Sequence, residues 1–253
     1  MVPKCDYHIH TDLIGCADKT MRIPAILHKC NLLGMERIGI TDHLNTLDQL
    51  PIHRQIKEQL AQESPKLEVY FGVELNFMGL DQGFAYSEQV RDELGYEFAI
   101  GGIHSAYGYQ RDKDKCLAIQ HRHHMKVMED PLCDVLVHPY WFGNAEFEQM
   151  DWFVDMSIIP DSWIRELGAA SAETGTAIEI NGCAFFHNPI YSKQWKESYI
   201  EYLKGLARAG AIFALGSDAH NIISLSAIHT VRAIADELDL PAYRFWHPTK
   251  KTN

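Results

Sequence analysis

Short apolar segments alternate with longer amphipathic segments along the whole chain. The apolar segments are rich in β-branched residues and each ends in a polar residue; they cover residues 4–10, 36–43, 67–74, 98–104, 134–138, 177–181 and 211–220. After each of them, apolar residues recur at helical spacing, over about 22–34, 52–63, 84–95, 113–129, 161–174, 195–209 and 225–238. The pattern predicts strands that are each followed by a helix.

Strands that alternate with helices are typical of parallel sheets joined by right-handed crossovers. No glycine-rich phosphate-binding motif follows the first predicted strand, and this favours a closed barrel over an open doubly wound sheet. We therefore predict the α/β class, as a (β/α)7 barrel similar to a TIM barrel, forming a single domain over residues 1–253. The active site of such a barrel lies at the carboxyl ends of its strands. Open sheets bind ligands at the same end, so the expected site does not depend on this choice.

The predicted strands end in residues that commonly bind metal ions. Six histidines, three carboxylates and one asparagine stand there: His8, His10, Asp42, His43, Glu74, His104, His138, Asn181, Asp218 and His220. His8 and His10 are two residues apart, so in a strand both side chains point to the same face. Nitrogen and carboxylate oxygen ligands suit Zn, Mn or Fe. Because one ion takes about four ligands, we expect two or three divalent ions.

Each of these residues taken singly has a simpler explanation. A polar residue at the end of a strand often caps the next helix, and a lone histidine is often a hydrogen-bonded core residue. The metal interpretation depends on so many strand ends carrying such residues together.

The remaining histidines and the arginines are not placed by the sequence. We expect His121, His123 and His124 on a solvated helix face, and we assign no role to His28, His53, His229 and His247. His187 follows the sixth strand and is a candidate for substrate contact. Arg54, Arg111 and Arg122 are candidates for phosphate contact. The aromatic-rich segment 140–160 could form a lid, a dimer contact or part of the core.

Composition narrows the classes of protein that remain. The net charge of −11 argues against broad binding to nucleic acid, which depends on basic residues, but allows a small anionic substrate beside bound cations. Six cysteines without a CxxC pair are typical of reduced thiols in the cytoplasm. We see no signal peptide and no stretch that could span a membrane, so we expect a cytoplasmic protein. The oligomeric state is left open.

Seven segments in order, DYHIHT, ITDH, GVE, GGIHS, LVHP, EIN and GSDAH, resemble the PHP family, named for polymerase and histidinol phosphatase. The resemblance extends from residue 6 to residue 220. It implies a distorted seven-stranded barrel that holds up to three metal ions. The first ion would be bound by His8, His10 and Asp218, and Glu74 would bridge it to a second. The second ion would also take His104 and His138, and a third would take His43 and His220.

The chain departs from the family pattern at two places. Many members have a further histidine ligand of the third metal where this chain has Cys16. A thiolate binds zinc well, so the third site could survive with a bias towards zinc. Alternatively, Cys16 packs and the third metal is weak or absent, or Asp12 or Asp18 substitutes for it.

The second departure concerns the phosphate. Histidinol phosphatases of the family commonly have an arginine shortly after the EIN segment, and none follows here. This weakens the assignment to histidinol phosphate. Phe185, Phe186 and Trp195 in that region could form an apolar wall of the site or part of the core.

We therefore expect a metal-dependent phosphoesterase that hydrolyses a small phosphate ester through a metal-activated hydroxide. Glu74 would bridge the metals, and Asp218 or His220 would pass a proton to the leaving group. A histidinol phosphatase is one alternative, and a metal-dependent nuclease or an amidohydrolase-type hydrolase is another. No predicted strand ends in the lysine that bridges the metals of many amidohydrolases. An inactive interaction module is the non-enzymatic alternative, but eight of the nine family ligand positions are present.

Overall fold

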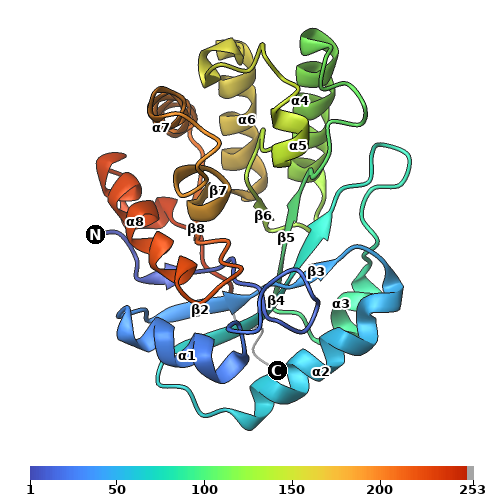
Figure 1. The fold of residues 1–253 in the computed structure, drawn as a ribbon, viewed down its shortest axis with the longest axis vertical. Helices are drawn as coiled ribbons and strands as arrows, with labels where there is room; N and C mark the ends of the chain where they lie inside the picture. Colours follow the sequence, from blue (N-terminus) through green and yellow to red (C-terminus); the bar gives the residue numbers. More distant parts are fainter. Residues whose placement is uncertain (250–253) are drawn as a thin grey trace.

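Parallel strands form the centre of the molecule, and the helices surround them (Figure 1). The computed structural model describes residues 1–249; the last four residues of the predicted domain, 250–253, lie outside the described residues. Neighbouring strands follow the order β1-β2-β4-β5-β6-β7-β8. Their bounds are β1 Cys5–Asp6, β2 Arg37–Ile40, β4 Glu68–Asn76, β5 Phe98–Gly102, β6 Val135–Leu136, β7 Ala177–Asn181 and β8 Phe213–Gly216. The predicted barrel class is confirmed.

One predicted strand is broken in two. The sequence predicts a strand over 36–43, but β2 ends at Ile40 and the two-residue strand β3, His43–Leu44, follows. Both β2 and β3 pair in parallel with β4. The break lies at Thr41 and Asp42, whose side chains accept hydrogen bonds from the segment after β1.

The ring is closed by residues beyond the end of β1. The backbone N–H of Tyr7 donates to the carbonyl of Leu215 (2.9 Å), and the N–H of Asp218 donates to the carbonyl of His8 (2.8 Å). Ile9 and Ala219 form an isolated parallel bridge. The first and last strands of the chain therefore lie side by side, and this brings His8 and His10 next to Asp218.

The helices begin and end close to the predicted positions. They are α1 Ile23–Leu32, α2 Leu50–Gln62, α3 Glu88–Leu94, α4 Lys113–Glu129, α6 Asp161–Thr174, α7 Lys193–Arg208 and α8 Ile228–Glu237. The short helix α5, Asn144–Phe147, was not predicted. Short 3-10 segments cover Leu47–Gln49, Met156–Ile158, Ser224–Ala227 and Ala242–Arg244, and a π-helical turn covers Gly182–Phe186. Within residues 1–249, every helix is too short or too polar to cross a membrane.

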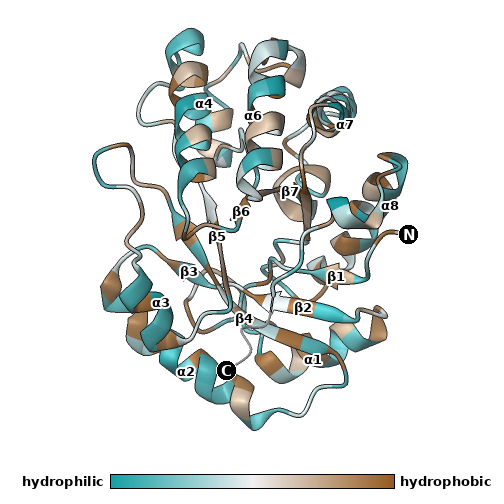
Figure 2. Cartoon of the chain, turned by 180° about the vertical axis from the view of Figure 1, so that it is seen from behind, coloured by the Kyte–Doolittle hydropathy of each residue, from teal (hydrophilic) through white to brown (hydrophobic). Residues whose placement is uncertain are grey.

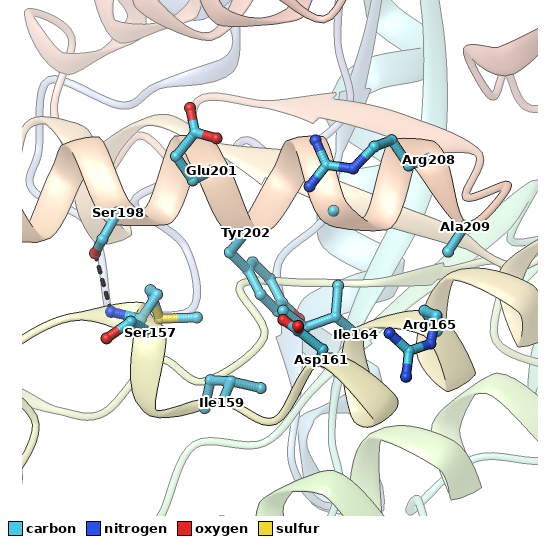
Figure 3. Close-up of a pocket in the computed structure, with 12 residues that line it drawn as sticks. Ser157, Ile159, Asp161, Ile164, Arg165, Ser198, Glu201, Tyr202, Arg208 and Ala209 are labelled. Atoms are coloured by element: carbon cyan, nitrogen blue, oxygen red, sulfur yellow. Dashed lines mark hydrogen bonds between the residues drawn. The ribbon is translucent and has the colours of Figure 1, made fainter.

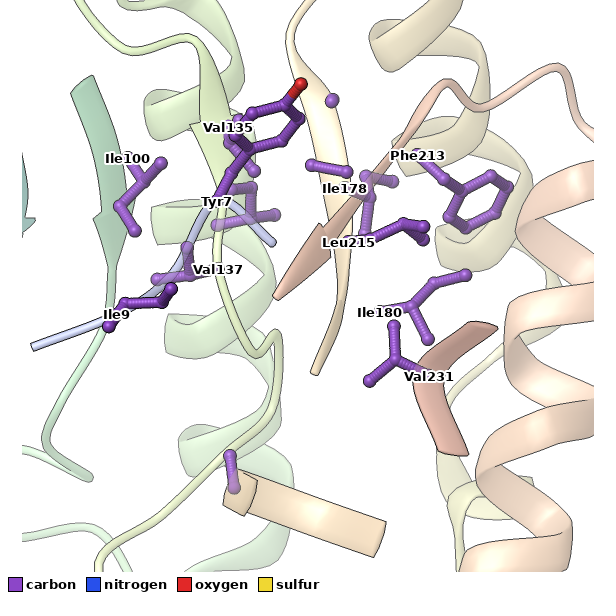
Figure 4. Packing of buried hydrophobic residues seen from close by; sticks show 14 of the residues in the cluster. Tyr7, Ile9, Ile100, Val135, Val137, Ile178, Ile180, Phe213, Leu215 and Val231 are labelled. Atoms are coloured by element: carbon purple, nitrogen blue, oxygen red, sulfur yellow. The ribbon is translucent and has the colours of Figure 1, made fainter. Parts of the chain in front are cut away.

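The alternation of side chains along β7 shows how the barrel separates core from site. Ile178 and Ile180 are buried in the apolar core, and Ile180 lies beside Val231 of α8 (Figure 4). Glu179 and Asn181, the alternate residues, point to the opposite face of the strand, where the histidines lie. Hydrophobic and hydrophilic residues likewise alternate along helices such as α2 and α3, as expected for helices with one buried face (Figure 2).

Part of the segment 140–160 lies in the core. Its buried side chains are Tyr140, Phe142, Met150, Phe153, Met156 and Ile159. Phe153 contacts the ring of Trp195 from α7, which in turn stacks on Phe185 at 5.4 Å. Trp195 and Phe185 are therefore core residues rather than a wall of the site, since each is almost fully buried.

The prediction of a solvated face for His121, His123 and His124 is wrong, because all three side chains are buried. His121 stacks on Trp163 of α6 and bonds through Nε2 to Glu166 (2.9 Å). His124 accepts a long bond of 3.4 Å from the backbone N–H of Tyr140. Three histidines within four positions cover more than one side of a helix, and α4 packs against both the barrel and α6.

Candidate metal centre

The carboxylate of Glu74, near the end of β4, lies at the centre of a cluster of imidazoles. Its Oε2 is 3.2 Å from Nε2 of His8, 3.3 Å from Nε2 of His10 and 2.9 Å from Nδ1 of His43. His8 and His10 come from the segment after β1, and His43 begins β3. The side chains of Glu74, His8 and His10 are almost completely buried.

The other carboxylate oxygen of Glu74 faces two further histidines. Oε1 is 3.0 Å from Nε2 of His104, which follows β5, and 3.2 Å from Nε2 of His138, which follows β6. Five imidazoles from four segments of the barrel, those after β1, β5 and β6 and the strand β3, thus surround one carboxylate. The structure brings these sequence-predicted residues together, as expected from the parallel register of the strands.

Asp218, after β8, contacts the same cluster. Its Oδ1 lies 3.3 Å from Nε2 of His10, 3.5 Å from Nε2 of His8 and 3.5 Å from Nδ1 of His220. The ring of His220 stacks on that of His10 at 4.3 Å.

Cys16 lies within the same cluster. Its sulfur and one ring nitrogen each of His10, His43 and His220 are all within 4.8 Å of one another. Of the two possible substitutes, Asp18 is exposed and its carboxylate bonds to Thr20, and Asp12 belongs to none of the ligand groups found among residues 1–249. The geometry therefore favours Cys16 over Asp12 or Asp18.

Two other predicted residues support the cluster without joining it. Asp42 accepts bonds from the backbone N–H (2.8 Å) and the hydroxyl (2.9 Å) of Thr11. Asn181 donates to Asp218 (3.2 Å) and accepts from the N–H of Ala184 (2.8 Å). Both residues therefore hold loops at the mouth of the barrel in place.

The backbone is unusual at two of the cluster residues. His138 and Asp218 have φ of +30° and +56°, in the left-handed region that residues with a side chain rarely adopt. Such strain tends to occur at functional sites, where the surrounding contacts maintain it. Gly102 on β5 makes room for the ring of His138, because a Cβ there would lie 2.7 Å from the His138 Cε1.

The pKa values of the cluster show opposed effects of burial and charge. Burial lowers the pKa of His8, but Glu179, Asp218 and Glu74 outweigh it and hold that pKa well above its usual value. Burial raises the pKa of Glu74, but the charges of His43 and His8 and the hydrogen bonds from His104 and His138 hold it well below the usual range. Burial also lowers the pKa of His10, to about 3.

These residues fit divalent metal ions. The Nε2 atoms of His8 and His10 face each other at 3.1 Å, and both also face Glu74 Oε2. Within residues 1–249, Glu74 Oε2 and His43 Nδ1 are buried and form no well-aligned hydrogen bond. Three ring nitrogens face Glu74 Oε2, and this oxygen has too few lone pairs to accept a hydrogen bond from each of them. Metal ions between these atoms would instead take the nitrogens and the oxygen as ligands.

Sequence reasoning missed two residues at the centre. Glu179 of β7 bonds to Nδ1 of His8 at 2.7 Å. The ring of Trp141 lies 5.2 Å from that of His138 and 5.9 Å from that of His104. Glu179 could have been found from its spacing of two from Asn181, which places both side chains on one face of the strand.

Two candidates and one histidine without an assigned role lie outside the cluster. Arg54 forms an exposed ion pair with Glu93, and His187 bonds to Thr230 of α8 at 2.8 Å. His53, to which no role was assigned, is buried and bonds through Nε2 to the carbonyl of His43 (3.0 Å).

A hollow of about 630 Å³ lies between α6, α7 and the 3-10 segment Met156–Ile158 (Figure 3). Arg165 and Arg208 line it together with Asp161 and Glu201. Its residues come from the outer helices, and none belongs to the histidine cluster.

The chain is similar to known proteins along most of its length. The PHP domain family matches residues 6–139, more than half of the 253 residues. A "Probable phosphatase" of Proteus mirabilis is 23% identical over 239 residues, covering 93% of this chain and 86% of the relative. A "Probable histidinol-phosphatase" of Deinococcus radiodurans is 25% identical, with 87% of each chain covered.

The solved structures support the fold. The structure of a proposed histidinol phosphatase of Listeria monocytogenes superimposes with a TM-score of 0.64 at 15% identity, covering 88% of this chain and 97% of the other. At this identity the likeness concerns the fold, and it agrees with the barrel described above.

Proposed function

Because the chain belongs to the PHP domain family, we propose that it is a metal-dependent phosphoesterase that hydrolyses a small phosphate ester. The observation that carries this proposal is the Glu74 carboxylate, with five imidazoles from four segments of the barrel around its two oxygens. The names of the relatives from Proteus mirabilis and Deinococcus radiodurans point to the same class of reaction.

We assign the ligands to two or three ions of Zn, Mn or Fe. His8, His10 and Asp218 would hold the first ion, and Glu74 would bridge it to a second ion held also by His104 and His138. His43, His220 and Cys16 would hold a third. The proximity of Cys16 to His43 and His220 supports this last group, and His10 is close enough to contribute to it.

Divalent ions in this centre would make a water molecule more acidic and would neutralise the phosphate oxygens. The protein residues have separate tasks. The buried carboxylates would compensate the charge of the ions. His220, the most exposed histidine of the cluster, and Asp218 beside it are placed to pass a proton to the leaving oxygen.

We favour a phosphate monoester of low molecular mass as the substrate. The fourteen-residue stretch after Asn181 contains no arginine, so the phosphate would be bound mainly by the metal centre. The indole N–H of Trp141 is buried and has no partner within residues 1–249, and its ring contacts two of the proposed ligands. It is therefore available to donate to a substrate oxygen. A histidinol phosphatase is not better supported than this broader class.

Elemental analysis of the purified protein, together with a panel of phosphorylated metabolites, tests the proposal. We expect two or three equivalents of metal per chain and hydrolysis of phosphomonoesters that chelators abolish and added metal restores. Purified protein that binds no divalent metal would contradict the proposal. Faster turnover of oligonucleotides or of amides and lactones would instead indicate the nuclease or the amidohydrolase-type alternative.

A further inference from the structure

A single buried carboxylate, Glu179 of β7, contacts residues from both the first and the second group of proposed metal ligands. Its Oε1 lies 2.7 Å from Nδ1 of His8. Its Oε2 accepts two hydrogen bonds, from the backbone N–H of His138 (3.0 Å) and from the side-chain amide of Asn181 (2.8 Å). The same amide also donates to Asp218 (3.2 Å).

The neighbouring strand is shaped to accommodate this carboxylate. Gly216 of β8 pairs with Asn181, and a Cβ at Gly216 would lie 2.0 Å from Oε1 of Glu179 and 2.7 Å from Cβ of His8. Such distances exclude every residue except glycine unless Glu179 and His8 move. Gly216 therefore leaves the space that the Glu179 carboxylate occupies beside His8.

The contacts have consequences for the two histidines. An ionised carboxylate only accepts hydrogen bonds, so the hydrogen of His8 lies on Nδ1 and its Nε2 is left free for a metal. The N–H of His138 belongs to a residue with φ of +30°, and the bond to Glu179 helps to maintain that strained conformation. One side chain thus acts on ligands proposed for two different ions.

We propose that Glu179 is a positioning residue that fixes His8 and Asp218 for the first metal and His138 for the second. This inference rests on the proposed metal centre. Glu179 would not bind a metal itself, and it acts through the two histidines and Asn181. Carboxylates that orient metal-binding histidines in this way typically contribute about 10–100-fold to metal affinity.

Glu179→Gln tests the proposal because the new side chain keeps the shape but not the hydrogen-bonding pattern. The two donors at Oε2, a backbone N–H and an amide that also bonds to Asp218, require an acceptor there. The amide nitrogen of the glutamine would then face His8 and donate to its Nδ1. The hydrogen of His8 would move to Nε2, the atom that should bind the metal.

The matched control is Glu166→Gln. Glu166 also bonds to a histidine, with 2.9 Å between its Oε2 and Nε2 of His121, but on the outer helices α4 and α6. Zinc affinity of the metal-free proteins is measured by competition with chelators of graded strength, and folding by thermal unfolding. In zinc-loaded protein with ¹⁵N-labelled histidine, NMR reports the Nδ1–H of His8.

We expect Glu179→Gln to bind zinc about 10–100-fold more weakly and to lose the Nδ1–H signal, while Glu166→Gln matches the wild type. A folded Glu179→Gln protein with wild-type zinc affinity and an unchanged signal would overturn the proposal. If Glu179→Gln does not fold, the NMR measurement on the wild type tests the proposal by itself. A zinc-loaded wild type without a hydrogen-bonded Nδ1–H on His8 would also overturn the proposal. A wild type that binds no zinc, manganese or iron contradicts the proposed function instead.

Discussion

His43 and Glu74 are directly opposite each other on the neighbouring strands β3 and β4, and Nδ1 of His43 lies 2.9 Å from Oε2 of Glu74. The two residues lie on consecutive strands of the chain, with α2 between them, and these strands are adjacent in the sheet. The register of the two strands therefore places the His43 imidazole beside the carboxylate that the other histidines surround.

Glu74→Gln should remove much of the metal and nearly all phosphoesterase activity. The amide has a single acceptor oxygen, so it can no longer serve both sets of imidazoles, and it carries no charge to compensate two ions. Metal content by elemental analysis and turnover of a phosphomonoester check this. Glu68→Gln, on the exposed beginning of the same strand, is the control. Full metal content and full activity in Glu74→Gln would disprove the bridging role.

Cys16→Ser should weaken the third metal site by at least about tenfold, because a hydroxyl is a much poorer zinc ligand than a thiolate. Cys16→His should retain the site, since imidazole is also a zinc ligand. In cobalt-substituted protein, a thiolate-to-cobalt absorption band should be present in the wild type and absent from both variants. A wild-type protein with three bound ions and no such band would show that Cys16 is not a ligand.

Zinc affinity should decrease as the pH falls below neutrality. The pKa values of His8 and His43 are raised by the surrounding carboxylates, so both imidazoles retain protons at a pH where an ordinary histidine has lost them. Because a metal must displace those protons, binding releases them and strengthens as the pH rises. Calorimetry at pH 7 in buffers of different ionisation enthalpy measures the release. Zinc binding whose heat does not depend on the buffer would contradict this expectation.

His124→Gln should reduce the acid sensitivity of the metal-free protein. Burial holds the pKa of His124 well below its usual value, so below about pH 6.5 the unfolded chain binds a proton that the folded protein does not. The free energy of unfolding contributed by this group therefore falls as the pH falls, by up to about 1.4 kcal/mol per pH unit. Glutamine can still accept the bond from Tyr140 but does not titrate.

Urea unfolding between pH 7.5 and pH 5 measures this slope. His28→Gln, which replaces an exposed histidine on α1, is the matched control and should follow the wild type. Parallel curves for the wild type and His124→Gln would mean that His124 is protonated in the folded protein or that it does not contribute.

The alternation of apolar strands and amphipathic helices was sufficient to predict the barrel and the bounds of most elements within a few residues. The ends of those strands also indicated the histidines and carboxylates that the structure brings together. This was possible because both depend on local rules: side chains alternate along a strand, and parallel strands of a barrel present their carboxyl ends on one face.

Errors arose where a side chain's surroundings depend on a neighbouring element. His121, His123 and His124 were expected in solvent, but α4 is covered by both the barrel and α6, so several of its faces are buried. The role of segment 140–160 was undecided for the same reason, since its aromatic residues pack on α7, a helix more than thirty residues further along the chain.

The sequence by itself determined the class of fold, the chemistry of the ligands and the end of the barrel at which they lie. Only the tertiary structure decided which ligand faces which, that Cys16 joins the cluster, and that Glu179 supports two groups of ligands at once. Hydrophobic periodicity is encoded in consecutive residues, whereas contacts such as that between His8 and Glu179 join residues 171 positions apart. Such contacts exist only once the register and the closure of the ring are set.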